Sequence, residues 1–306
     1  MRRPRALVPG DRVAIVAPAS PFDSERFELG VAEIERFGLT PVITEGVFAR
    51  RGYVAGDARS RAAALTDAWR DPSIAALMAA RGGYGSAQVL PFLDPAVVRE
   101  AAKPFIGHSD LTALLVYLTT RCGSVCFHGP MVQNLAGGEA GYDRDSFRRC
   151  LMTPAPVGEL TADGLETLRA GEASGPLLGG TLTQLVASLG TPYAFAPPSG
   201  YVLLLDEVGE RPYRIDRMLT QLAASGVLTR AAAVVCGELP GCDDPSGHPT
   251  ARGVVAELLQ AFPGPVLFGF PTGHTAGPAL TVPLGTAVRV VGGRRSRLIV
   301  TEAAVA

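Results

Sequence analysis

The sequence predicts an α/β protein in which a parallel sheet covered by helices is followed by a second, strand-rich domain. Strand and helix signals alternate through the first half of the chain, and this βαβα order is typical of a parallel sheet with helices on both faces. After Gly175 the apolar segments are mostly strand-sized and helical patterns become fewer. A chain of 306 residues is long for one compact core, so we expect two domains that share a cleft.

The expected elements of the first domain follow one another along residues 1–130. Short apolar runs indicate strands at residues 13–16, 41–43, 74–78 and 105–106. Asp23 and Ser24 are typical helix caps and Gly38 is a typical helix end, so they bound the first helix. We expect further helices at residues 59–69, 86–90 and 111–119.

A weakly patterned segment at residues 131–174 separates the two domains. Gly137, Gly141, Pro154 and Pro156 interrupt it, so we place the connection between domains there. In the domain at residues 175–306 we expect strands at residues 201–205, 232–236, 265–268, 281–291 and 296–301. The last two lie close together in the chain, which favours antiparallel pairing and a partly barrel-like domain.

Composition excludes several classes of function. With 28 basic and 29 acidic residues the net charge is -1, and no basic run could follow a phosphate backbone, so we expect no nucleic acid partner. The N-terminus lacks the apolar stretch of a signal peptide and no window could span a bilayer, so we expect a cytoplasmic protein without a membrane partner. Lys103 is the only lysine, which argues against Schiff-base chemistry.

Ser109 lies where an apolar strand end and Gly107 meet the start of a helix. A serine at such a corner is held at the carboxyl edge of the sheet, and the free N–H groups of the helix could stabilise an oxyanion. The segment is not the G-x-S-x-G pattern, because Leu111 stands where the last glycine would be. A serine before an apolar run is also a routine helix cap, so a nucleophile and a cap both remain open.

The turn Arg81-Gly82-Gly83-Tyr84-Gly85 follows another apolar strand and places bare backbone at the same edge of the sheet. Its amides could face an anion. A phosphate loop is not expected because no Gly-Lys-Ser/Thr follows, and Gln88 breaks the dinucleotide fingerprint. A tight turn without function is the alternative.

A nucleophilic serine needs a base, and the chain has only four histidines. His274 follows an apolar strand in a glycine-containing turn, where catalytic groups are commonly mounted. His108 is adjacent to Ser109 and should point away from it, and His128 also fits a structural role at a strand end. His248, in a loop rich in Gly and Pro, should be solvated.

Asp206 and Glu207 bring two acids to the end of a strongly apolar strand, where one could orient the base. Strand side chains alternate, so the two acids point to opposite sides and only one can serve. A pair of solvated residues at a strand end is the alternative.

The five cysteines favour reduced, buried thiols rather than disulfides or a metal site. Cys122, Cys126 and His128 are close in sequence, but they supply three ligands without a second paired cluster. The loop at residues 242–248 also contains potential ligands, which fit the composition of a turn better.

Seven short segments occur in a fixed order along nearly the whole chain: Val16-Ala17-Pro18-Ala19-Ser20, Arg81-Gly82-Gly83-Tyr84-Gly85, Gly107-His108-Ser109-Asp110, His128-Gly129-Pro130-Met131, Gly179-Gly180-Thr181-Leu182, the run from Asp206 to Arg217, and Gly273-His274. In this order they resemble the LD-carboxypeptidase family, which includes muropeptide carboxypeptidases and microcin-immunity hydrolases. Each segment alone is modest, but their joint order is specific.

The resemblance implies a Ser–His–acid triad with Ser109 as the nucleophile and His274 as the base. It implies an oxyanion site formed by the amides of Gly83, or its neighbours in the turn, and of Asp110. It also implies a flavodoxin-like N-terminal domain, a β-rich C-terminal domain, a homodimer and no metal, and we expect no cofactor.

The order of the two acids departs from the family. The family usually has Glu then Asp at this strand end, whereas this chain has Asp206 then Glu207. Alignment of the downstream Gly-Glu-Arg-Pro-Tyr-Arg segment without a gap places Asp206 at the position of the family's glutamate, and we follow that register. A slip of one residue would give the role to Glu207.

The function implied by the resemblance is a serine carboxypeptidase of cell-wall recycling, which cleaves the L,D amide bond that releases the terminal D-alanine of murein tetrapeptides. Two alternatives remain. One is a related serine amidase that acts on a peptidyl-nucleotide antibiotic. The other is a non-catalytic peptide-binding protein in which Ser109 only caps its helix.

Overall fold

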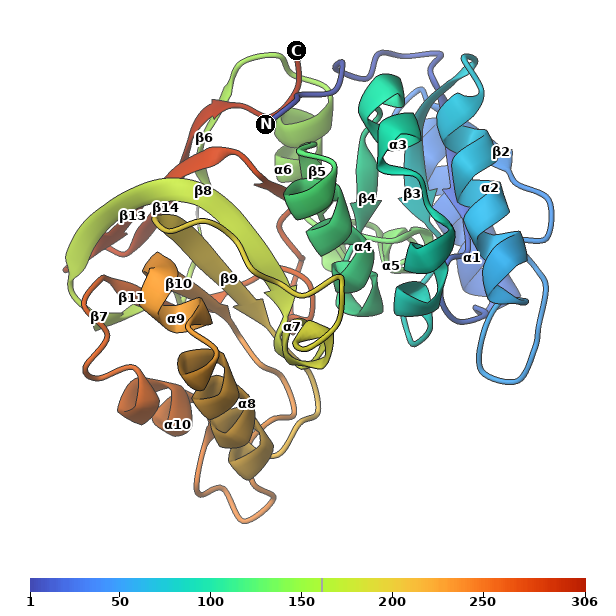
Figure 1. Ribbon diagram of the computed structural model, residues 1–306. Coiled ribbons are helices and arrows are strands. Elements are labelled where there is room, and N and C mark those ends of the chain that lie inside the picture. The colour runs from blue at the N-terminus through green and yellow to red at the C-terminus, as the bar shows by residue number, and fades with distance from the viewer. Residues whose placement is uncertain (161) are drawn as a thin grey trace.

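The computed structural model describes residues 1–160 and 162–306 and contains two sheets that lie side by side. Figure 1 shows the first sheet with its helices on one side of the molecule and the second sheet on the other. The two ends of the chain meet, because Ala6 donates to the carbonyl of Ala306 and Ala306 donates to that of Pro4. Among the described residues, none of the helices combines the length and the apolar character that a membrane span requires.

The first sheet has the strand order β12-β5-β4-β3-β1-β2. Its strands are β1 (Arg12–Val16), β2 (Thr40–Ile43), β3 (Ile74–Ala79), β4 (Phe105–Gly107), β5 (Cys126–His128) and β12 (Val282–Leu284). The first five pair in parallel, as the alternating pattern predicts. Their carboxyl ends therefore meet at one edge of the sheet, which is where the candidate residues lie.

Helices cover this sheet, and the helix at Pro95–Ala101 is additional to those that the sequence predicts. They are α1 (Ser24–Arg36), α2 (Ala58–Arg70), η1 (Ser86–Phe92), α3 (Pro95–Ala101), η2 (Ser109–Leu111), α4 (Thr112–Val116) and η3 (Tyr117–Arg121). Asp23 and Asp57 cap α1 and α2 by accepting from backbone N–H groups of the first turn. Two elements differ in type: η1 is a 3₁₀ helix that contains Pro91, and the helix expected at residues 111–119 ends in the π-helical turn η3.

The segment at residues 131–174, expected as a connection, contains regular structure. It holds α5 (Val132–Leu135), η4 (Gly138–Ala140), α6 (Arg144–Leu151), β6 (Pro156–Leu160) and β7 (Glu166–Arg169), and β8 begins at its end. Both β6 and β7 join the second sheet, where they form its two edges.

The second sheet has the order β6-β14-β13-β8-β9-β10-β11-β7. Its remaining elements are β8 (Gly171–Thr181), α7 (Leu182–Ser188), β9 (Tyr201–Asp206), α8 (Pro212–Ala224), α9 (Val227–Arg230), β10 (Ala231–Gly237), α10 (Ala251–Leu258), β11 (Val266–Phe270), β13 (Ala287–Gly292) and β14 (Arg297–Ala303). The antiparallel pairing of β13 with β14 confirms the expectation from their spacing, and β8 to β11 add a parallel core. The domain is β-rich without a closed barrel among the described strands, although Gly293, just after β13, donates to Thr167 in β7. The sheet therefore curls back on itself.

The strand expected at residues 281–291 is split in two. A turn at Gly285, with φ of 90°, separates β12 from β13, and β12 crosses back to pair antiparallel with β5. One apolar core consequently runs from the strands of the first sheet to Leu177 and Val202 of the second. This continuous packing fixes the position of one domain against the other.

Candidate active site

Ser109 is the first residue of η2 and occupies a strained backbone corner just after β4. Its φ is 64°, in the left-handed region that non-glycine residues seldom adopt. The residue at the N-cap position of η2 is His108, without a side-chain capping bond. The arrangement differs from the extended caps of α1 and α2, so Ser109 is not a helix cap here.

The glycine turn after β3 lies directly against Ser109. A β-carbon on Gly82 would be 2.9 Å from Cβ and 3.2 Å from Oγ of Ser109. A β-carbon on Gly83, whose φ is 93°, would be 2.5 Å from Oγ of Ser20. Only glycine fits these two positions. Without side chains, the backbone of the turn can approach Ser109 at Gly82 and Ser20 at Gly83.

Two buried polar residues lock this turn to the start of the helix that follows Ser109. Ser86 donates from its backbone N–H to Oδ2 of Asp110 at 2.7 Å and from its hydroxyl to the Asp110 carbonyl. Arg61, almost completely buried, donates to the carbonyl of Gly85 at 2.8 Å and also holds Pro18. The two backbone stretches that flank Ser109 therefore form one rigid unit.

His274 is paired with Asp206, which ends β9. Nδ1 of His274 lies 2.8 Å from Oδ2 of Asp206, and the backbone N–H of His274 donates to Oδ1 at 3.1 Å. Burial alone would raise the pKa of Asp206, but the hydrogen bond and charge of His274 hold it below its ordinary value. Burial likewise opposes the charge on His274, but Asp206 outweighs it, so the pKa of His274 lies above the usual 6.5.

Glu207 points to the other side of β9 and makes a different set of contacts. Its carboxylate accepts from the backbone N–H and hydroxyl of Thr183, at 2.8 and 2.6 Å, and from the backbone N–H of Val208. Burial raises the pKa of Glu207, and these hydrogen bonds offset that effect only in part. Because Thr183 is in the first turn of α7, Glu207 acts as an anchor for that helix.

Two further histidines, which sequence reasoning did not place in the site, surround the pair. The ring of His108 lies 5.2 Å from that of His274 and 5.8 Å from that of His128. Burial lowers the pKa of His108 to about 3 and that of His128 to about 4, so both rings are neutral at pH 7. His108 follows β4 and His128 ends β5. These strands are parallel neighbours, so their carboxyl ends lie together, and this position could have indicated that the two histidines are close.

The proton on His128 can be assigned from its partner. The hydroxyl of Thr272 donates to the carbonyl of Leu280 at 2.8 Å, so it must accept from Nδ1 of His128 at 3.1 Å. Nε2 of His128 is then the bare nitrogen, and it lies 3.8 Å from Oδ2 of Asp206. Asp206 is therefore enclosed by two imidazole rings.

Within the described residues, the hydrogen bonds of His274 go to Asp206 and none goes to Ser109. His274 uses Nδ1 for Asp206, which leaves Nε2 as its accepting nitrogen. Such contacts are often long in a free enzyme and tighten when substrate binds. The chain thus brings an elbow serine, a histidine and a buried carboxylate to the place where the two sheets meet.

Comparison with known families agrees with this geometry. The model of the LD-carboxypeptidase N-terminal domain matches residues 13–129, and that of the LD-carboxypeptidase C-terminal domain matches residues 174–290. The chain belongs to the LD-carboxypeptidase family. The expectation from the ordered motifs is confirmed.

Relatives of this chain carry names that agree with the family. A Streptomyces coelicolor protein named as a carboxypeptidase is 40% identical over 287 residues, which cover 92% of this chain and 91% of its own. The murein tetrapeptide carboxypeptidase of Pseudomonas aeruginosa is 32% identical, and the match covers 87% of this chain and 88% of that protein. A solved structure of a microcin self-immunity protein has the same fold, with a TM-score of 0.90, 22% identity and 99% of both chains covered.

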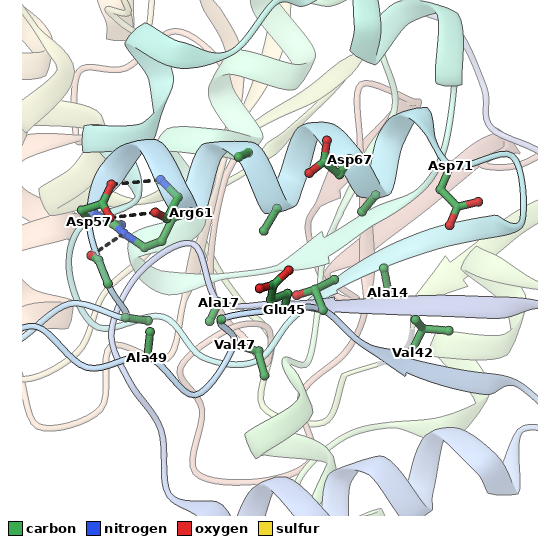
Figure 2. A pocket seen from close by; sticks show the side chains of 18 of the residues that line it. Ala14, Ala17, Val42, Glu45, Val47, Ala49, Asp57, Arg61, Asp67 and Asp71 are labelled. Carbon is green, nitrogen blue, oxygen red and sulfur yellow. Dashed lines mark hydrogen bonds between the residues drawn. The ribbon is translucent and has the colours of Figure 1, made fainter.

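A separate cavity lies beside α2. It has a volume of about 630 Å³, and Figure 2 shows Asp67 and Asp71 on the helix side and Val42 and Glu45 on the strand side. Its remaining wall combines small apolar side chains with Asp57, Ser60 and Arg61, and Ser109, Asp206 and His274 do not line it. The cavity therefore borders the candidate site only through Arg61, which also donates to the carbonyl of Gly85.

The five cysteines are free and buried. Sγ of Cys126 donates to the carbonyl of Leu115 at 3.7 Å, and that of Cys150 donates to the carbonyl of Thr281 at 3.3 Å. Burial raises the pKa of Cys122 to about 12, so its thiol stays protonated. In the part of the chain that the structure describes, no group of three His, Cys, Asp or Glu side chains could hold a metal ion.

Proposed function

We propose that this peptidase is a serine-type LD-carboxypeptidase that releases the terminal D-alanine of murein tetrapeptides. The name of the Pseudomonas aeruginosa relative supports this substrate. The observation that carries the proposal is the buried Asp206–His274 pair beside an elbow serine with φ of 64°. We further propose that it acts in the cytoplasm as a homodimer, in the recycling of cell-wall peptides.

The first half of the proposed reaction forms an acyl-enzyme. Oγ of Ser109 attacks the scissile carbonyl while Nε2 of His274 takes its proton, and Asp206 holds the ring and stabilises its cationic form. The backbone N–H groups of Gly83 and Asp110 stabilise the oxyanion of the tetrahedral intermediate. That intermediate collapses when His274 returns the proton to the departing amine of D-alanine.

The second half repeats these steps with water. His274 removes a proton from a water molecule, whose oxygen attacks the ester carbonyl of the acyl-enzyme. The second tetrahedral intermediate collapses with the C–O bond to Ser109 breaking, and the serine recovers its proton from His274. The products are a tripeptide with a free carboxylate and free D-alanine.

Asp206 rather than Glu207 is the proposed orienting acid. Both oxygens of Asp206 accept from His274, one from the ring and one from the backbone. The carboxylate of Glu207 instead accepts hydrogen bonds from Thr183 and Val208.

The experiment that tests the proposal is the release of D-alanine from a panel of muropeptides, followed by mass spectrometry. Wild-type protein should shorten a disaccharide-free tetrapeptide by one residue, and Ser109→Ala should lose at least about 10³-fold in kcat while it stays folded. Ser246→Ala, in an exposed turn, is the matched control and should keep full activity. Near-normal turnover by Ser109→Ala would exclude the mechanism.

A second candidate, an amidase for peptidyl-nucleotide antibiotics, is favoured by one finding. A microcin self-immunity protein of Escherichia coli is 26% identical to this chain, and the match covers 93% of this chain. The same panel, extended with an aminoacyl sulfamoyl nucleoside, separates the two substrates. Labelling of Ser109 by a fluorophosphonate separates either enzyme from a non-catalytic peptide-binding protein.

A further inference from the structure

The segment that joins β8 to α7 lies between the two halves of the candidate site. It runs from Gly179 to Gln184 and is called here the bridging segment. Figure 1 shows the end of β8 and the start of α7 beside α4, the helix that follows Ser109. The mechanism proposed above gives this segment no role.

The bridging segment is hydrogen-bonded to the nucleophile side at two points. The backbone N–H of Thr181 donates to the hydroxyl of Thr112 at 2.9 Å, and both residues are buried. The side-chain amide of Gln184 donates to Oδ1 of Asp110 at 3.1 Å. Thr112 and Asp110 lie three residues and one residue after Ser109, so these bonds hold the backbone that carries the nucleophile.

The same segment is bonded to the acids at the end of β9. Thr181 pairs with Asp206 in the register of β8 and β9, and its hydroxyl donates to Oδ2 of Asp206 at 3.3 Å. Thr183 donates to Glu207 from its backbone and its hydroxyl. One turn of chain therefore contacts both the nucleophile loop and the strand end that orients His274.

Glycine at position 180 permits this close approach. A β-carbon there would lie 2.5 Å from Oγ1 of Thr112, and the φ of Gly180 is 146°. A β-carbon on Gly179 would lie 2.1 Å from the carbonyl oxygen of Leu204. The bridging segment is thus pressed between α4 and β9, and any side chain at either glycine would push the two apart.

We propose that Thr112 and Gln184 are positioning residues that set the separation of Ser109 from His274 through the bridging segment. The inference rests on the proposed function, since it concerns the same triad. Ser109 follows β4 of the first sheet and His274 follows β11 of the second, and the hydrogen bonds of His274 within the described residues go to Asp206. Contacts between the domains must therefore fix the distance from Ser109 to His274. Misplacement of reacting groups by about 1 Å is enough to lower a rate about 10²-fold.

The test replaces the hydroxyl of Thr112 without changing the shape of its side chain. Thr112→Val should lower kcat at least about 10-fold with KM within about twofold, because ground-state binding groups are untouched while the attack geometry is lost. The rate of fluorophosphonate labelling of Ser109 should fall in parallel. Thr112→Ser keeps the hydroxyl and should restore most of kcat.

The matched control is Thr119→Val, on the same helical stretch. Its hydroxyl is also buried but donates to the carbonyls of Leu115 and Val116 within its own helix. This variant should keep the kcat and the labelling rate of the wild type. If Thr112→Val does not fold, Gln184→Met, which removes the amide donor to Asp110 from a partly exposed position, gives the same readouts.

The outcomes separate this inference from the proposed function. A Thr112→Val protein, or failing that a Gln184→Met protein, with the kcat and labelling rate of the wild type overturns the positioning role and leaves the triad standing. D-alanine release that survives Ser109→Ala overturns the proposed function itself. If muropeptides are not the substrate, the labelling rates of the folded variants still decide whether the bridging segment positions Ser109.

Discussion

Gly273 and Asp206 lie so close together that a β-carbon on the glycine would be 2.4 Å from Oδ2 of the carboxylate. The backbone before His274 therefore runs against Asp206. Both the backbone N–H and the imidazole of His274 reach the carboxylate. Because the chain approaches so closely, the shorter aspartate side chain is long enough where the family usually has a glutamate.

Replacement of Gly273 should consequently inactivate the enzyme. We expect Gly273→Ala to lower kcat/KM at least about 10²-fold, because the added carbon meets Asp206 and His128 and the φ of 67° disfavours alanine. Release of D-alanine is the measurement. Gly277→Ala is the control, because nothing lies within 4 Å of its β-carbon, and equal activity of the two variants would contradict the prediction.

The two acids at the end of β9 should differ sharply on substitution. Asp206→Asn should lower kcat by about 10³- to 10⁴-fold, since an amide no longer holds the required tautomer of His274. Glu207→Gln should mainly lower the midpoint of thermal unfolding, because it weakens the anchor of α7 at Thr183. Steady-state kinetics and thermal melts of both variants check this, and the reverse pattern would assign the role to Glu207.

The dependence of activity on pH should report His274. The base must be neutral to accept the proton of Ser109, and Asp206 holds the pKa of His274 above 6.5 despite burial. The acidic limb of kcat/KM should therefore fall as the pH drops through a value above 6.5. If the acidic limb of the wild type has its midpoint at or below pH 6.5, the pairing of His274 with Asp206 is contradicted.

Stability should fall in acid because two buried histidines are neutral. In the unfolded chain they take up protons near pH 6.5, whereas in the folded protein the pKa values of His108 and His128 are about 3 and 4. As the pH falls from 6.5 to 4, each of these buried histidines should lower the free energy of unfolding by about 1.4 kcal/mol per pH unit.

Denaturant unfolding across this pH range measures the effect. His128→Gln should reduce the slope of unfolding free energy against pH by about one proton. An unchanged slope in His128→Gln would show that this ring is not neutral when buried.

Much of the fold could be predicted because its signals are local. The apolar run at β1, the cap at Asp23 and the glycine end at Gly38 lie within a few residues of the elements that they bound, and the structure has each of them. The path of β12 could not be predicted in this way. Its apolar residues fit either sheet, and only the packing of the folded chain decides that Val282 pairs with His128.

For the site, the sequence by itself determined that Ser109 follows a strand end, that His274 sits in a glycine turn and that two acids end β9. Alternation along a strand also required that those acids face opposite sides. Only the tertiary structure decided that Asp206 is the one that faces His274 and that His108 joins the cluster. Spacing along the chain fixes local direction, but which face is buried and which strands are neighbours depends on contacts between residues far apart in the sequence.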